Sequence, residues 1–172
     1  QIEKQMPFPI LEWHPDSGSE FINWHCKGWC EDKQQKLTRS RPNHKNDNAY
    51  VEQKNGHVIR RFLGYTRLDQ KEVVKLMNEI YDLLELYLNH FVPSKKLIEK
   101  VRVGSKYKKK YGKAKTAYKR VLEHKEINQE MKDKLVKDHK QLNPLLLKRK
   151  IDTLIEELFK INRTLRELIS KD

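Results

Sequence analysis

The chain has 172 residues, of which 37% are hydrophobic and 35% are charged, and its formal net charge is +13 at pH 7. This length suits one domain with an appendage, and the charge favours a polyanionic partner, with nucleic acid preferred over an anionic membrane. No apolar run approaches the roughly 18 residues of a membrane span, no signal peptide is expected, and two cysteines make no disulfide framework. The composition therefore predicts a cytoplasmic protein without a membrane segment, and the first residue, Gln1, leads us to expect a fragment.

Four short elements are predicted in the first third of the chain. Ser19 is a suitable cap for the first helix, Asp47 or Asn48 for the second, and Gly64 is a suitable stop for the second. Prolines in the first strand confine it to a sheet edge. The predicted elements are a strand over 6–14, a helix over about 20–32, a weak strand over 36–40 and a helix over about 48–63.

The longest strongly apolar helix is predicted from Asp69 to Phe91. Apolar residues keep helical spacing from Val73 onwards, and Pro93 ends the run. Asp69 is followed three residues later by Glu72, which is the spacing of a capping box. We interpret this helix as a packing element.

A strongly basic segment follows, from Ser94 to Arg120. It contains twelve Lys or Arg residues and one acidic residue, Glu99, which gives it a net charge of +11, and three tyrosines are interleaved with the cations. Lys108, Lys109 and Lys110 suit phosphate contacts, with the tyrosines stacking on bases. The alternative is a basic loop that only interacts with solvent. We favour DNA contact, because solubility does not require so dense a charge.

Two helices are predicted after this segment, the first short and polar over 127–140. Asn143 as cap and Pro144 at the first helical position begin the second. Its apolar residues form a heptad seam, which predicts burial either against the preceding helix as a hairpin or against another subunit of a homo-oligomer. The seam consists of Leu147, Ile151, Leu154, Leu158, Ile161, Leu165 and Leu168.

Two carboxylates suggest a metal site. Asp16 follows the first predicted strand, Glu52 lies in the basic helix over 48–63, and thirty-five residues separate them. Carboxylate oxygens are hard ligands suited to Mg²⁺ or Mn²⁺. A pair of such ions can activate an attacking oxygen and stabilise the leaving oxygen of a phosphodiester. Spacing alone leaves open that both acids are ordinary surface residues.

Three motifs resemble those of retroviral-type integrases and DDE transposases. The segment DSGSEF at Asp16 resembles the second-aspartate motif, and VEQKN, from Val51 to Asn55, resembles the E-x-x-N of the third acid. The family's hallmark is thirty-five residues between these acids. LYLNHFVPSKKL, from Leu86 to Leu97, resembles a downstream signature of the family. The chain is most similar to transposases of bacterial insertion sequences with an integrase-type core.

The resemblance implies a fold, an activity and a site. The fold would be α/β, a partial RNase H-like core without its first strands, followed by a mainly helical C-terminal region. The activity would be DNA cleavage and strand transfer in the bacterial nucleoid, with transposon ends and target DNA as partners. Asp16 and Glu52 would be the second and third ligands of Mg²⁺ or Mn²⁺. The expected domains are 1–92 for the core, 93–123 for DNA contact and 124–172 for the helical tail.

The same resemblance points to residues near Glu52 that would contact DNA. Asn55 lies one helical turn beyond the acid, and Lys54 is its neighbour. Arg60 and Arg61 are close in sequence, although helical phase does not place all four on one side.

The chain departs from the family pattern in two places. Ser17 stands where the family usually has Asn, and both residues suit the turn. No aspartate precedes Asp16, so the family's first acid is absent. We therefore expect the 172-residue chain neither to hold the metal pair tightly nor to join DNA. The alternative function is a non-catalytic DNA-binding or assembly protein derived from a truncated transposase.

Two other groups of residues contain side chains of types that bind metals or stack on bases. His14, His25, Cys26 and Cys30 contain metal-binding side chains, but their spacing does not match a tetrahedral zinc site, and the cysteines are expected to be ordinary helix residues. Trp13, Trp24 and Trp29 are expected to pack in a core rather than to stack on bases.

Overall fold

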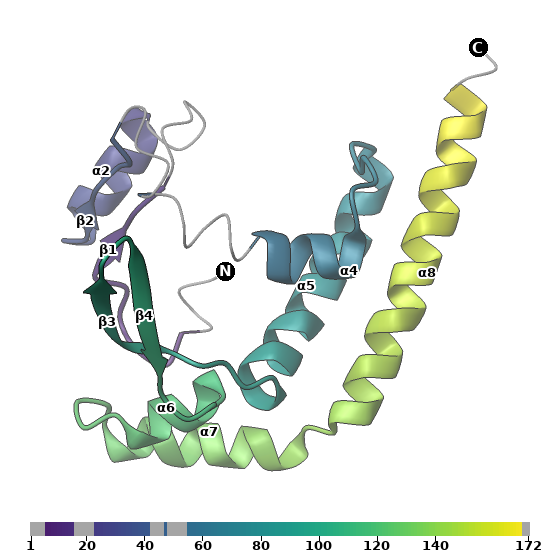
Figure 1. The fold of residues 1–172 in the computed structure, drawn as a ribbon. Helices are drawn as coiled ribbons and strands as arrows, with labels where there is room; N and C mark the ends of the chain where they lie inside the picture. Colours follow the sequence, from purple (N-terminus) through teal and green to yellow (C-terminus); the bar gives the residue numbers. More distant parts are fainter. Residues whose placement is uncertain (1–5, 16–22, 42–46, 48–54, 170–172) are drawn as a thin grey trace. The chain divides into compact units, whose positions relative to one another are not determined.

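The computed structural model has mixed α/β architecture (Figure 1). It divides into two compact units, Gln1–Thr66 and Arg67–Asp172. The α/β class is thereby confirmed, whereas an RNase H-like arrangement stays a prediction. The residues that the structure describes are 6–15, 23–41, 47 and 55–169.

The first unit contains a small parallel β-α-β arrangement. Strands β1 (Glu12–Trp13) and β2 (Lys36–Leu37) pair in parallel, with Glu12 opposite Lys36. Helix α2 (Trp24–Asp32) lies between them in sequence, as parallel pairing requires a crossover connection. Both predicted strands are confirmed, although each is shorter than expected.

Helix α2 begins later than predicted. Asn23 has extended backbone angles, φ −136° and ψ 168°, and its side-chain oxygen accepts a hydrogen bond from the Cys26 amide at 2.9 Å. This is the geometry of an N-cap, so the helix starts at Trp24 and the predicted start near residue 20 is wrong. Ser19 lies outside the described residues.

Aromatic residues of this unit are only partly in its core. The Trp13 and Trp29 rings pack edge to face with centroids 5.4 Å apart, and the indole nitrogen of Trp13 donates to the Gln35 side chain at 2.7 Å. Trp29 is nevertheless 36% exposed, and the prediction of core packing is clearly wrong for Trp24, which is 82% exposed. Its ring lies beneath the Lys27 ammonium, at 5.2 Å.

The predicted second helix is described from Asn55 onwards. A π-helical turn, η2 (Asn55–Arg60), continues into α4 (Arg61–Leu63). The helix ends at Gly64, which has φ +65° and ψ −148° and confirms the predicted stop. Residues 48–54 of the predicted helix lie outside the described residues, so the cap, Asp47 or Asn48, stays a prediction. Asp47 is described, and its carboxylate binds the Arg41 side chain at 2.9 Å.

Replacing Gly64 with alanine is expected to destabilise the first unit by about 1–3 kcal/mol. A side chain is strained at this combination of positive φ and extended ψ, which is essentially restricted to glycine. Gly28 is the matched control, because it lies inside α2, has no positive φ and has open space around a built Cβ. Gly28→Ala should instead stabilise by about 0.5–1 kcal/mol. Urea unfolding followed by tryptophan fluorescence would measure the stability of both variants. Equal changes in the free energy of unfolding would contradict the backbone strain expected at position 64.

The second unit is built on two long helices, α5 (Lys71–Phe91) and α8 (Pro144–Ile169), which pack along each other (Figure 1). Leu147, Leu154, Ile161 and Leu165 of the predicted seam are half-buried, and Leu168 is 57% exposed. The core residues of the pair are Val73, Ile80 and Leu84 from α5 and Ile151 and Leu158 from α8.

The heptad seam therefore finds its partner within the chain. The sequence offered the preceding helix or a second subunit, and the structure shows a third arrangement, burial against α5. Helix α5 thus belongs with the C-terminal helices, whereas the expected domain boundary lay after it, at residue 92. Self-association through the last helix stays a prediction.

The start of α5 differs from the expected capping box. The N-cap position is Gln70, which makes no side-chain cap hydrogen bond. The Asp69 carboxylate is instead bound by Arg67 at 2.7 Å and by Arg166 of α8 at 3.1 Å. The prediction of Asp69 as a cap is wrong because this ion pair with a distant helix takes its oxygens. The predicted end before Pro93 is confirmed.

The start of α8 matches the prediction. The Asn143 side chain accepts hydrogen bonds from the amides of Leu145 and Leu146, at 3.0 and 3.2 Å. These bonds satisfy amides that have no partner inside the helix, so Asn143 is the expected cap with Pro144 at the first helical position.

A β-hairpin and two shorter helices connect α5 to α8. The hairpin consists of β3 (Leu97–Val103) and β4 (Lys106–Tyr111), and it is followed by α6 (Ala117–Glu123) and α7 (Gln129–Gln141). The sequence did not predict strands in this region. Among the described helices, none is both long and apolar enough to cross a membrane.

Candidate nucleic-acid interface

Residues 97–111 of the basic segment fold as an antiparallel hairpin with a two-residue turn and one register irregularity, between Leu97 and Glu99. Gly104 and Ser105 connect the strands, and Gly104 has φ +61°. A positive φ at the first turn residue alone is the signature of a type II′ turn, whose twist suits a hairpin and which requires glycine there. The hairpin thus forms because glycine occupies the one position where other residues are strained.

The register sorts the side chains onto two faces, because directly opposite residues point to the same side of a ribbon. Lys100 lies opposite Lys109, and Arg102 lies opposite Tyr107. We call this side the tyrosine face. It contains a cation–π contact, with the Lys100 ammonium 4.3 Å from the centre of the Tyr107 ring.

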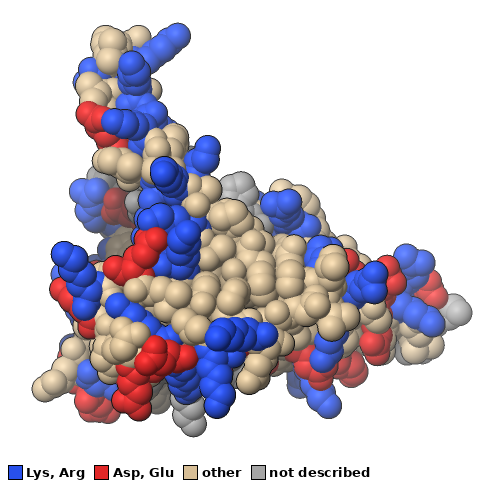
Figure 2. All heavy atoms as spheres, turned by 90° about the horizontal axis from the view of Figure 1, so that it is seen from below, with Lys and Arg blue, Asp and Glu red and all other residues tan. Residues whose placement is uncertain are grey.

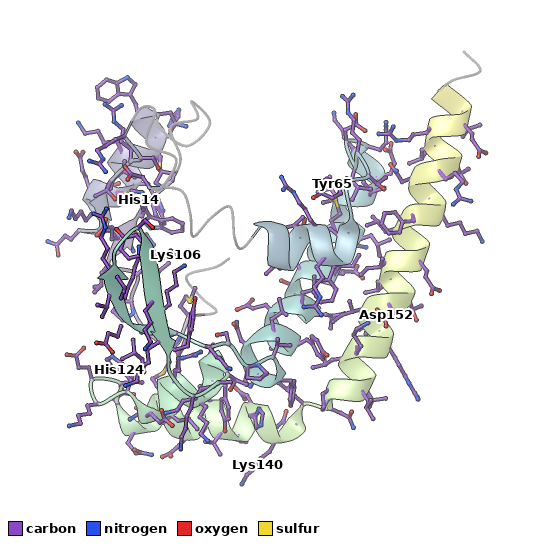
Figure 3. The ribbon with its side chains drawn as sticks, in the orientation of Figure 1. His14, Tyr65, Lys106, His124, Lys140 and Asp152 are labelled. Carbon is purple, nitrogen blue, oxygen red and sulfur yellow. The ribbon has the colours of Figure 1, made fainter. Side chains whose placement is uncertain are left out.

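The other side is called the valine face. Val101 lies opposite Lys108, Val103 opposite Lys106, and Glu99 opposite Lys110. Each face therefore carries three cations, and the valine face also carries the one carboxylate of the hairpin strands. Lys106, which follows the turn, is labelled in Figure 3.

Both strands are exposed along their whole length. Within the described part of the chain, no carboxylate lies within salt-bridge distance of a hairpin cation. Among the side-chain hydrogen bonds between described residues, the only one that a hairpin cation donates runs from Arg102 to the Gly104 carbonyl, at 3.2 Å. On the face that Figure 2 presents, Lys and Arg side chains stand out at many points, with Asp and Glu between them. The hairpin cations therefore keep their charge for an external anion.

The base of the hairpin is fixed to α6. Ser94 and Lys115 exchange two backbone hydrogen bonds, at 3.0 and 3.1 Å, which close the ends of the hairpin. The Arg120 guanidinium of α6 donates to the Ser94 hydroxyl at 3.2 Å and also to its carbonyl. Lys115 forms an ion pair with Glu123, and its hydrogen bond lowers the pKa of that carboxyl. The hairpin therefore projects from an ordered support.

An aromatic stack joins that support to α5 and α7. The Tyr118 ring of α6 stacks on His139 of α7, with centroids 4.1 Å apart, and on His90 of α5 at 5.1 Å. The Nδ1 atoms of His90 and His139 are 2.9 Å apart, so one imidazole donates a hydrogen bond to the other. This cluster therefore holds α6 against α5 and α7.

Acidification is expected to weaken this stack. Burial, followed by the charge of His139, lowers the pKa of His90 below its usual 6.5, and Asp138 partly opposes this. The unfolded chain then binds the proton more readily than the folded chain, so the stabilisation is fully present above pH 6.5 and is lost as the pH falls below it.

Urea unfolding at pH 7 and pH 5 would measure this effect. His90→Phe keeps an aromatic ring without titrating, and it should lose less stability between the two pH values than the unsubstituted chain. His124→Asn, at an exposed position, is the control and should keep the full loss. If His90→Phe loses as much stability between pH 7 and pH 5 as the control does, the pH dependence does not arise from His90.

The residues expected to form the metal site cannot be placed. Asp16, Glu52 and Lys54 lie outside the described residues, and of Asn55 only its position at the start of η2 is described. Asp16 follows the last residue of β1 by three positions in the sequence. In the part of the chain that the structure describes, no three His, Cys, Asp or Glu side chains converge to hold a metal ion.

The predicted DNA-binding cations that are described belong to both units. Arg60 and Arg61 are exposed in the first unit, and the Arg60 guanidinium lies 5.1 Å from the exposed Tyr65 ring. Lys108, Lys109 and Lys110 lie in β4 of the second unit, with Lys109 on the tyrosine face and its two neighbours on the valine face. Although the three lysines are adjacent in sequence, Lys109 points to the opposite side of the ribbon from Lys108 and Lys110.

Three further residues of this surface were not singled out from the sequence: Lys100, Arg102 and Lys106. The signal for them is the sequence IEKVRV-GS-KYKKKY, in which two strand-like runs flank a Gly-Ser pair. Such a pair between two runs is a recognised hairpin signal. The density of lysine in the second run conceals it, because lysine is disfavoured in strands.

The candidate zinc ligands make ordinary contacts. The two ring nitrogens of His14 lie 2.7 Å from the Thr38 hydroxyl and 3.5 Å from the Ser40 hydroxyl. Cys26 and Cys30 are free thiols, and burial, reinforced by Cys26, raises the pKa of Cys30. A raised pKa keeps the thiol protonated, which disfavours metal binding.

Comparison with known proteins gives one relative and no family. No family model matches the chain, and no solved structure matches it. The chain is 42% identical over 111 residues to "Uncharacterized protein y4rM" of Sinorhizobium fredii (strain NBRC 101917 / NGR234), a match that covers 64% of this chain. The same match covers 32% of the relative, so the chain spans about a third of the length of that protein.

Proposed function

We propose that this chain is the C-terminal portion of the catalytic core, with its tail, of an integrase-type DNA transposase, and that it binds DNA through the β3–β4 hairpin. The single structural observation that supports DNA binding is the exposed β3–β4 hairpin, which carries six cations and one carboxylate and lies within the basic segment Ser94–Arg120 of net charge +11. A protein neutralises DNA phosphates with such cations, and the release of counterions drives binding.

The chemical part of the proposal rests on the carboxylates. Asp16 and Glu52 would be the second and third acidic ligands of Mg²⁺ or Mn²⁺, and the family's first acid, on an earlier strand of the core, would complete the site. The bound ions would supply activation of the attacking oxygen and stabilisation of the leaving oxygen. The parallel β1–α2–β2 arrangement supports this, because ligand sites of α/β sheets lie beyond the carboxyl ends of parallel strands, and Asp16 follows β1.

The test is strand transfer by a longer protein that includes the coding sequence upstream of Gln1. We expect Mg²⁺-dependent joining of donor to target DNA, and its loss below detection in Glu52→Gln, which keeps the size of the side chain but removes its charge. Glu72→Gln, at an exposed position at the start of α5, is the control and should keep activity.

The alternative is a non-catalytic DNA-binding protein derived from such a transposase. It shares the basic hairpin, so it predicts DNA binding without strand transfer. Full activity in Glu52→Gln, or DNA binding with no joining in the longer protein, would reject the catalytic proposal. The 172-residue chain itself is expected to bind DNA without joining it, because the first acid is absent.

A further inference from the structure

The hairpin carries cations on both faces, and this distribution needs an explanation. A ribbon that lies flat on a duplex turns one face to the nucleic acid and the other to solvent. Cations on the solvent face would then add nothing to binding. They would also be unfavourable for folding, because like charges directly opposite each other repel, as Lys100 and Lys109 do.

Resting on the DNA binding proposed above, we propose that the hairpin enters the major groove of duplex DNA turn first. The tyrosine face then contacts the phosphates of one wall and the valine face those of the other. Three cations on each face are matched by two negatively charged walls. The repulsion between Lys100 and Lys109 is relieved when phosphates approach them.

The dimensions of the hairpin select the groove. Stacked sheets lie about 10 Å apart, backbone to backbone, and this is the space that a ribbon with packed side chains on both faces occupies. The major groove of B-DNA is about 12 Å wide, and the minor groove is about 6 Å wide. The ribbon therefore fits the major groove and is too thick for the minor groove.

The turn and the base suit this direction of entry. Gly104 and Ser105 are small and uncharged, and a Cβ built on Gly104 has nothing within 4 Å, so the leading end of the hairpin is slender. The opposite end is held by the Ser94–Lys115 pair and by Arg120. An anchored base and a slender turn let the two faces enter between the phosphate strands together.

The experiment compares matched charge removals on the two faces in the full 172-residue chain. One variant carries Lys100→Gln and Lys109→Gln on the tyrosine face, and the other carries Lys108→Gln and Lys110→Gln on the valine face. Lys150→Gln with Lys160→Gln, at exposed positions of α8, removes the same charge elsewhere. Affinity for a 20-base-pair DNA duplex is measured between 50 and 200 mM salt, and circular dichroism verifies folding.

Each face variant is expected to reduce the slope of log K against log salt by about 1.8, because each phosphate contact contributes about 0.9. The four substitutions together should reduce it by about 3.6, and the α8 variant should leave it unchanged. An effect of one face only, with the other face behaving like α8, shows flat docking and overturns the inference while DNA binding stands. Absence of salt-dependent binding by the unsubstituted chain rejects the proposed DNA binding itself.

Two further probes test the groove. A 20-mer single strand has no groove, and an RNA duplex of the same length has a deep, narrow major groove that side chains do not enter. Weaker binding to both than to duplex DNA supports entry into the major groove. Equal or tighter binding to either overturns it.

Discussion

Truncation of Ile80 to alanine is expected to lower the free energy of unfolding of the second unit by about 2–5 kcal/mol. Ile80 is fully buried in the middle of α5, where its helix packs along α8. The loss combines the lost burial of the removed carbons with the cavity left in their place. Because small domains are stable by only about 5–15 kcal/mol, this is a large share of the total.

Urea unfolding followed by helical circular dichroism would measure the effect. Val74→Ala is the matched control, since Val74 lies on the same helix and is 50% exposed, and its change should be within about 1 kcal/mol. Leu158→Ala, from the fully buried part of α8, should match Ile80→Ala, whereas Leu168→Ala, at an exposed position, should match the control. Small, equal changes in all four variants would show that α8 does not pack on α5 in solution.

This result would also bear on self-association. The seam residues that a second subunit would contact are the ones that α5 covers, with Ile151 and Leu158 fully buried. A dimer formed through this helix would use its exposed apolar residues or would displace α5. Leu145 and Leu146, at the start of α8, are 69% and 62% exposed. Light scattering of the Leu145→Ser, Leu146→Ser variant would distinguish a dimer that uses these exposed residues from a dimer that displaces α5.

Helices α5, α7 and α8 of the second unit were predictable because their signals are local, whereas α6, inside the basic segment, was not predicted. The Asn143 cap, the Pro144 start and the Pro93 stop act on the residues beside them, and the periodicity of α5 and α8 marks their buried faces. A heptad seam predicts that one face of a helix is buried, but it does not identify the element that covers this face. That is why α5 was not identified as the partner of α8.

At α5, the prediction failed because a distant residue decided the outcome. Asp69 has the right spacing for a cap, but Arg166 lies 97 residues away in sequence and binds its carboxylate. In the candidate site, the charge of the basic segment was readable from the sequence, whereas the distribution of its cations on two faces depends on the strand register. Register follows from the Gly104–Ser105 turn, and a shift of one residue exchanges the faces.

The largest effect on binding is expected from the three adjacent lysines. Changing Lys108, Lys109 and Lys110 to glutamine should weaken binding to duplex DNA at 0.1 M salt by about 500-fold, if each lysine contacts one phosphate. The slope of log K against log salt is about 0.9 per phosphate contact, so each contact raises the affinity at 0.1 M salt about eightfold relative to 1 M salt. The loss of three contacts multiplies three such factors, which gives about 500-fold. The fold should be unaffected, because all three side chains are exposed on strands that keep their backbone pairing.

The matched control removes three exposed lysines from the helices, Lys137, Lys150 and Lys160. It lowers the net charge by the same amount, so it isolates the effect of position from the effect of total charge. Long-range attraction to DNA is screened beyond about 10 Å at 0.1 M salt, which leaves the helix variant with a loss of a fewfold at most. Equal losses in the two triple variants would mean that DNA responds to net charge alone and that the hairpin is not the contact surface.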